Sequence, residues 1–296
     1  MRTALSAVVV CLMVCLPSRA EAWGFTAHRL IMEGAIALLP PELKPLFDQH
    51  REELLIRVTD PDTWRNVGWP DDPNHFVDFG APVFGEYPFA ALPRDLDAAL
   101  EKFGPRVLDD NGRLPWREAE MYGHLRRAFA EFSRQAPYTV SNTVVYAGVA
   151  SHYVQDASQP FHATINYDGQ QTGQNGIHSR FERDLVERFG ARLQLRPEAP
   201  RHIASIRDFC FDTLLASHQQ VAVVLQADKE ALGQKDTYDD AYFEAFFTRV
   251  QPVLEAQLST AISATASLIV SAWEDAGRPV VRARDVRPVE RARRAR

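Results

Sequence analysis

The strongest constraint on the fold is a repeat of apolar side chains at three- and four-residue intervals along nearly the whole chain. In residues 26–39, for example, Ile31, Ala35 and Leu38 follow this spacing, and Pro40 ends it. The spacing places apolar side chains on one face of an α-helix, whereas the alternating polarity typical of strands is nearly absent. The sequence therefore predicts an all-α fold, with helices over residues 26–39, 41–56, 94–103, 116–134, 140–156, 179–189, 203–225, 239–258 and 260–276.

Two long connections interrupt the helical pattern, at residues 68–88 and 166–176, where glycine, proline and polar amides cluster. Each connection lies between residues that we expect to meet in one site, so neither has the character of a domain linker. The chain of 296 residues, of which 46% are hydrophobic, is long enough for one large core. We predict a single helical domain over residues 23–277 with two long functional loops.

Residues 1–22 have the pattern of a secretory signal peptide. Arg2 supplies positive charge, an apolar run follows, and small residues allow cleavage after Ala22. The run is too short and too poorly flanked for a good membrane span, and the alternatives are a retained anchor or lipidation at Cys15. Cleavage predicts a periplasmic or extracellular protein without a transmembrane span, in which Cys210 is the remaining cysteine and no internal disulfide forms.

Residues 278–296 hold eight arginines against Asp285 and Glu290, in a chain whose overall net charge is −6. Such a run predicts a solvated, disordered tail. The alternative is a peripheral contact between the tail and an anionic surface of lipid or nucleic acid.

The segment HYVQDASQPFH, residues 152–162, combines three side chains that zinc prefers. On a helix, His152 and Asp156 are four residues apart and face the same way, and His162 follows Pro160, where the helix should end. The segment HSRFE repeats the four-residue spacing with His178 and Glu182. The alternative is a set of hydrogen-bonded core residues, but several imidazole and carboxylate groups at this spacing favour a metal site.

Further candidate ligands lie upstream. Asp60 and Asp62 stand in a Pro-Asp turn, and His75 and Asp78 follow in the segment NHFVDF. Aspartates in turns usually cap helices or bond their own backbone, so these residues are informative as members of a set. Cleavage after residue 22 would also expose the amino group of Trp23, with His28 five positions later.

Taken in this order, the motifs resemble those of the zinc-dependent phospholipase C and P-one nuclease superfamily. The resembling segments span residues 23–182, and the final helix ending SAWEDAG at residues 271–277 is similar to the end of the phospholipases. The resemblance implies an all-α domain with a trinuclear zinc cluster at the bottom of a cleft.

The resemblance also assigns ligands to three Zn²⁺ ions. One ion would take Asp62, His75, His152 and Asp156; the second would take the amino and carbonyl groups of Trp23, His28 and the shared Asp156; the third would take His162, His178 and Glu182. Asp60 competes with Asp62 for the first ion, and Asp62 is favoured because it follows Pro61 and precedes Arg65 as the motif implies.

The chemistry implied by the resemblance is hydrolysis of a phosphodiester without an organic cofactor. A hydroxide that bridges the first two zinc ions would attack phosphorus, and the third ion would stabilise the leaving oxygen. Asp62 would be the catalytic residue that orients the attacking water. The HExxH, GxSxG and Walker motifs of other hydrolases are absent from the sequence.

The sequence leaves two classes of substrate open, phospholipid and single-stranded nucleic acid. Glu182 and the final helix favour an exported phospholipase C-like enzyme that acts on phospholipid. The alternative is a single-strand-specific nuclease or 3′-nucleotidase, because Phe76 and Asp78 resemble a base-binding pair. If these two residues have only structural roles, Phe76 is a core aromatic and Asp78 caps a helix or turn. A third hypothesis is a non-catalytic binding protein in which zinc replaces disulfides as the stabilising element.

Overall fold

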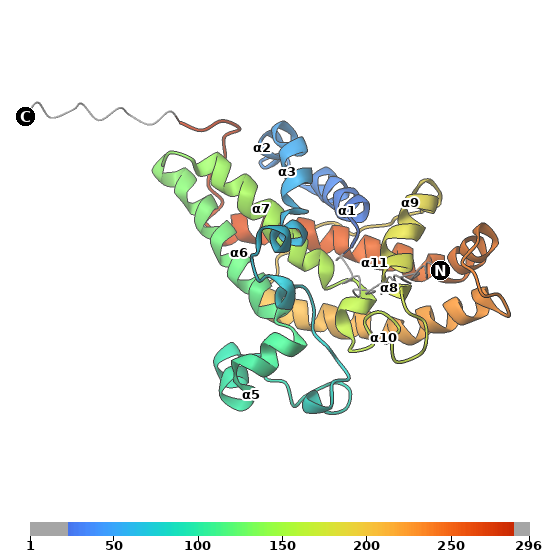
Figure 1. The fold of residues 1–296 in the computed structure, drawn as a ribbon. Coiled ribbons are helices and arrows are strands. Elements are labelled where there is room, and N and C mark those ends of the chain that lie inside the picture. The colour runs from blue at the N-terminus through green and yellow to red at the C-terminus, as the bar shows by residue number, and fades with distance from the viewer. Residues whose placement is uncertain (1–22, 287–296) are drawn as a thin grey trace, which may run out of the picture.

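The computed structural model describes residues 23–286, and these residues form helices and connections without a strand (Figure 1). The α-helices are α1 (Phe25–Leu38), α2 (Lys44–Gln49), α3 (Arg51–Arg57), α4 (Asp60–Trp64), α5 (Leu96–Asn111), α6 (Leu114–Ala130), α7 (Thr139–Asp156), α8 (Ile177–Ser179), α9 (Leu185–Phe189), α10 (Ile206–Leu232) and α11 (Asp240–Asp275). The shorter elements are the 3₁₀ turns η1 (Arg65–Val67), η2 (Asp72–His75), η3 (Pro82–Phe84), η4 (Glu131–Arg134), η5 (Pro160–Ala163) and η7 (Gly190–Arg192), and the π-helical turn η6 (Arg180–Asp184). The all-α prediction is confirmed, while the predicted signal peptide and residues 287–296 lie outside the described residues.

Helix α11 is one helix of 36 residues, where the sequence predicts two helices that meet near Ser259. Serine hydroxyls compete for backbone hydrogen bonds, which makes a run of them look like a helix end. Here the hydroxyls bond within the helix: Ser259 Oγ donates to Glu255 O at 2.6 Å and Ser263 Oγ donates to Ser259 O at 2.8 Å. The predicted break is therefore wrong.

The same serines hold the connection between η7 and α10 against α11. The amide of Arg196 donates to Ser259 Oγ at 2.9 Å, and the amide of Glu198 donates to Ser263 Oγ at 2.9 Å. Each hydroxyl thus donates to a carbonyl of its own helix while it accepts a hydrogen bond from the connection. This arrangement satisfies backbone groups that a long irregular segment would otherwise leave unpaired.

The described core consists of two apolar clusters joined by α11. The larger cluster combines residues of α1, α3, α6, α7, α10 and the C-terminal half of α11. The smaller cluster contains Trp23, Phe161, Phe181 and the N-terminal half of α11. Because α7 belongs to the first cluster and the segments near Phe161 and Phe181 belong to the second, the C-terminal end of α7 lies at their junction.

The beginning of the arginine-rich tail, residues 278–286, is fixed to the helical body. Asp285 accepts hydrogen bonds from the amide of Val140 at 2.8 Å and from the hydroxyl of Ser141 at 2.7 Å, at the N-terminus of α7. A carboxylate at this position satisfies free helix amides and opposes the positive end of the helix dipole. The segment that the sequence predicts to be disordered therefore caps α7 as far as Asp285.

Among the described residues, α11 is the one helix long and apolar enough to cross a membrane by length and composition alone. Most of its apolar window is buried inside the fold, where it packs against α1, α6, α7 and α10. This composition is what the central helix of a bundle requires.

Candidate metal centre

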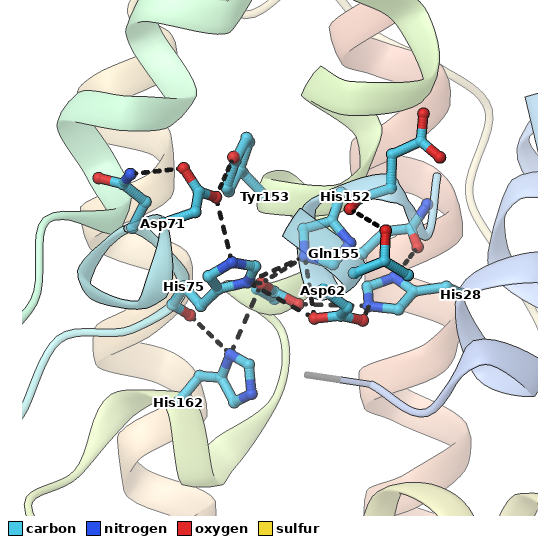
Figure 2. A network of polar contacts seen from close by, with 12 residues as sticks. His28, Asp62, Asp71, His75, His152, Tyr153, Gln155 and His162 are labelled. Atoms are coloured by element: carbon cyan, nitrogen blue, oxygen red, sulfur yellow. Dashed lines mark hydrogen bonds and ion pairs between the residues drawn. The ribbon is translucent and has the colours of Figure 1, made fainter. Parts of the chain in front are cut away.

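Eight of the predicted ligand side chains converge near the C-terminal end of α7. Figure 2 labels five of them, His28, Asp62, His75, His152 and His162. They form three groups in which one ligand atom of each residue lies within 4.8 Å of the others. The groups are His28, His152 and Asp156; Asp62, His75 and His152; and His162, His178 and Glu182. We call them the second, first and third groups, after the ions to which the resemblance assigns most of their members. The second group differs from that assignment, because it contains His152, which the resemblance gives to the first ion.

Local structure explains how short segments supply these side chains. His152 and Asp156 are one turn apart on α7, and both are fully buried. Pro160 begins η5, which turns the chain back so that His162 faces the same region. His178 Nε2 and Glu182 Oε2 lie 2.9 Å apart across the junction of α8 and η6.

Asp156 is the centre of the first two groups. Its Oδ2 atom lies 3.0 Å from His75 Nδ1 and 3.2 Å from His152 Nε2, while its Oδ1 atom lies 3.5 Å from His28 Nε2. The two carboxylate oxygens therefore face different imidazoles. This geometry suits a carboxylate that bridges two cations.

Three of the imidazoles use their outer nitrogen to bond the protein. His152 Nδ1 donates to Val58 O at 2.8 Å, and His162 Nδ1 donates to His75 O at 2.6 Å. His28 Nδ1 donates to the side-chain oxygen of Gln155 at 2.6 Å. Such bonds fix the ring and the tautomer, so that each Nε2 atom offers its lone pair to the interior of the site.

Burial keeps three histidines neutral. Desolvation lowers the pKa of His28 and of His162 to about 3, and that of His178 to about 4. A neutral imidazole is the form that binds a metal ion. These side chains are therefore already in their ligand state near neutral pH.

His75 and Asp156 form the charged pair of the centre. Burial opposes protonation of His75, but hydrogen bonds to Asp156 and Asp71 outweigh it and raise the pKa of His75 to about 10. Burial likewise opposes ionisation of Asp156, yet the imidazole of His152 and hydrogen bonds from His152 and His75 hold its pKa well below the usual value. A cation bound here would replace the proton of His75, as metal binding to histidine generally does.

The buried atoms of the centre fit a metal ion better than they fit each other. His28 Nε2 and Asp156 Oδ1 are buried and have no hydrogen-bond partner among the described residues, at a separation of 3.5 Å. His152 Nε2 and His75 Nδ1 face each other at 3.0 Å, where one proton at most can lie between them. Buried polar atoms normally have partners, so this arrangement indicates a binding site rather than a closed structural network.

A cavity of about 490 Å³ opens onto the first and third groups. Its wall includes Asp62, His75, His162 and His178, together with Pro61, Arg65, Asp72, Pro73, Phe76, Asp78, Asp109, Asp110, Phe161 and Tyr167. His28, His152 and Asp156 are fully buried and do not line it. Members of the first and third groups thus face the cavity, while the second group is buried in the protein.

The two residues predicted to contact substrate both line this cavity. Phe76 is half-buried, and Asp78 is 8% exposed, with its Oδ1 atom buried and without a hydrogen-bond partner in the described part of the chain. Burial raises the pKa of Asp78 to about 7. A carboxyl group in this state can accept a hydrogen bond from a ligand or donate one to it.

Asp60 and Asp62 have different surroundings on α4. Asp60 is partly exposed and accepts a hydrogen bond from Arg57 at 3.1 Å. Asp62 is buried and lies 3.8 Å from His75 and 3.6 Å from His152. The structure places Asp62 in the first group and Asp60 outside it.

Trp23 is fully buried beside the second group. Its indole Nε1 donates to the main-chain oxygen of Gln155 at 2.9 Å, and Gln155 also accepts the hydrogen bond of His28. Gln155 therefore holds Trp23 and His28 next to each other. The predicted ligation by the amino group of Trp23 stays a prediction.

The sequence did not single out the residues that hold the ligands. Gln155 bonds His28, Gln159 Nε2 donates to Glu182 Oε2 at 2.9 Å, and Asp71 lies 3.2 Å from His75. Both glutamines lie within HYVQDASQPFH, but no spacing rule marks an amide as the partner of a ligand. Asp71 precedes His75 by four residues, and this spacing is the sequence signal that could have identified Asp71 as the partner of His75.

The chain matches no family model and no curated protein.

Proposed function

We propose that this protein is an exported zinc-dependent phosphodiester hydrolase of the phospholipase C type. The observation that carries the proposal is the set of three histidine-carboxylate groups, of which the first and third contribute side chains to the wall of one cleft. Nitrogen and oxygen ligands in mixed sets favour Zn²⁺, and three such groups provide for three ions. The ion count, the ion identity and the reaction are all parts of the proposal.

Zinc, when bound, would supply positive charge for a phosphate and lower the pKa of water to about 7. The protein's own residues supply the geometry. Asp156 is fixed between imidazoles of the first two groups, and Asp62 lines the cleft beside them, where it can orient a water molecule towards phosphorus. His162 and His178 line the cleft on the side of the third group, where the leaving oxygen would be held.

The charge of the cleft wall favours a small zwitterionic phosphodiester. Asp72, Asp78, Asp109 and Asp110 line the cavity, against one lining guanidinium, that of Arg65. Part of this charge is balanced locally, because Asp109 forms an ion pair with Arg113 and Asp110 forms one with Arg106. The excess of lining carboxyl groups disfavours a long polyanion and suits a phosphate next to an amine, as in a phospholipid headgroup.

One observation favours the nuclease alternative. Phe76 and Asp78 line the same cavity, and together they offer an apolar face for stacking and a carboxyl group for a base edge. A single-strand-specific nuclease or 3′-nucleotidase is therefore the second candidate. A single nucleotide at the site would need less positive charge around the cleft than a long strand.

The test is turnover by protein that begins at Trp23, loaded with zinc. We expect hydrolysis of phosphatidylethanolamine or phosphatidylcholine vesicles to exceed hydrolysis of single-stranded DNA, and a chelator to abolish it. Preference for single-stranded DNA, lost in Asp78→Ala, would favour the nuclease. Zinc binding with no turnover on either substrate would leave only a zinc-stabilised binding protein.

A further inference from the structure

We propose that Asp71 is a positioning residue for the metal centre: its carboxylate fixes the His75 ring so that Nδ1 faces the ion of the first group. This inference rests on the proposed function, because it assumes that the first group binds zinc. Asp71 is not itself placed as a ligand in any of the three groups.

The two nitrogens of His75 face different surroundings. Nδ1 points into the centre, 3.0 Å from Asp156 Oδ2 and 3.0 Å from His152 Nε2. Nε2 points away from it, 3.2 Å from Asp71 Oδ2 (Figure 2). An N–H group at Nε2 that donates to Asp71 leaves the lone pair of Nδ1 for the ion.

Asp71 is held rigidly while it contacts His75. It is 1% exposed, and its Oδ2 atom accepts a hydrogen bond from the hydroxyl of Tyr153 at 2.6 Å. Its Oδ1 atom accepts from Asn74 Nδ2 at 2.8 Å and from Arg117 Nη2 at 3.3 Å. Three donors besides His75 therefore determine the position of the carboxylate.

Asp71 also differs in charge from the partners of the other histidines. His152 and His162 donate to main-chain carbonyl groups, and His28 donates to an amide. A carboxylate is a stronger acceptor, so it makes the imidazole a better electron donor to a metal ion. The zinc affinity of the first group should therefore depend on Asp71 more than the zinc affinity of the second group depends on Gln155.

The positive charge of Arg117 makes this buried carboxylate tolerable. Arg117 comes from α6, which contributes no candidate ligand, and its guanidinium also donates to Glu120 at 3.0 Å near the surface. It packs over the ring of Tyr153 at 5.3 Å. Glu120 thus offers a matched control, because it shares Arg117 with Asp71 but lies away from His75.

The test compares zinc binding by Asp71→Asn, Glu120→Gln and the unaltered protein, by competition with a chromophoric chelator. We expect Asp71→Asn to weaken one of the zinc-binding steps by about 10- to 100-fold, the usual effect of losing such a partner. Glu120→Gln should leave all steps unchanged. Tyr153→Phe, which removes one anchor of Asp71, should weaken the same step by a smaller factor.

Thermal unfolding measured with zinc and with excess chelator separates a positioning role of Asp71 from a role in folding. A positioning role predicts that zinc raises the melting temperature of Asp71→Asn less than that of the unaltered protein. Zinc affinities in Asp71→Asn equal to those of the unaltered protein would overturn the inference alone. Absence of zinc binding by the unaltered protein would overturn the proposed function and the inference with it.

Discussion

Two buried polar clusters differ in how many of their buried polar atoms have hydrogen-bond partners. The Arg180 cluster consists of Gln174, Arg180, Asp228 and Tyr242. In it, Asp228 accepts hydrogen bonds from Gln174 Nε2 at 2.7 Å, from Arg180 Nη2 at 3.1 Å and from the hydroxyl of Tyr242. In the metal centre, by contrast, His28 Nε2 and Asp156 Oδ1 have no hydrogen-bond partner among the described residues.

The difference separates a structural role from a binding role. Arg180 also donates to the main-chain oxygens of Gln174 and Asn175, so the Arg180 cluster closes the 166–176 loop onto α10 and α11. Both charged groups of this cluster are hydrogen-bonded, and the amide oxygen of Gln174 is its one buried atom without a partner among the described residues. The metal centre instead leaves lone pairs facing one another. Buried polar groups of that kind are stable when something else satisfies them.

The largest expected effect is that of zinc on the metal centre. If zinc completes this cluster, each ion should add about 4 kcal/mol to the free energy of unfolding at a free zinc concentration a thousand times its Kd, or roughly 12 kcal/mol for three ions. Asp156→Asn should lose most of this gain, because Asp156 is shared between two groups. Denaturant unfolding with zinc and with chelator measures it; equal stability in both conditions would contradict the comparison.

The Arg180 cluster should behave in the opposite way. Asp228→Ala leaves the guanidinium of Arg180 buried without its carboxylate, which should lower the free energy of unfolding by about 3–5 kcal/mol, with or without zinc. The control is Asp240→Ala, which breaks the exposed pair between Arg188 and Asp240 and should cost less than about 1 kcal/mol. A loss in Asp228→Ala that appears only when zinc is bound would place this cluster with the metal centre.

Asp78 gives a smaller effect that depends on pH. Because its pKa is raised from 3.8 to about 7 by burial, the folded protein loses stability through this group as pH rises from about 4 to 7. Asp78→Asn, measured with chelator, should therefore match the unaltered protein near pH 3.5 and exceed its free energy of unfolding by about 2–4 kcal/mol at pH 8. A difference that stays constant over this range would show that the carboxyl group is not desolvated.

Periodicity was sufficient for most of the fold. The apolar spacing of residues 26–39 and 140–156 corresponds closely to α1 and α7. Helix α1 buries one face along its length, as does the first half of α7, whereas every residue of α7 from Ala147 to Asp156 is buried. The same reasoning failed at Ser259, since a serine inside a helix and a serine at its end look alike in sequence. It also missed the contact of Asp285 with α7, which joins residues far apart in the chain.

The sequence by itself determined an all-helical chain and the residue types of the centre, because helical spacing and i, i+4 histidine-carboxylate pairs such as His178 and Glu182 are local properties. The motif favoured Asp62 over Asp60, and the tertiary structure places Asp62 beside His75 and His152. Only the tertiary structure decided that Asp71 holds His75 and that both oxygens of Asp228 accept hydrogen bonds. The reason is physical. Whether a buried polar atom has a partner depends on side chains that approach from other helices, and no local pattern records their positions.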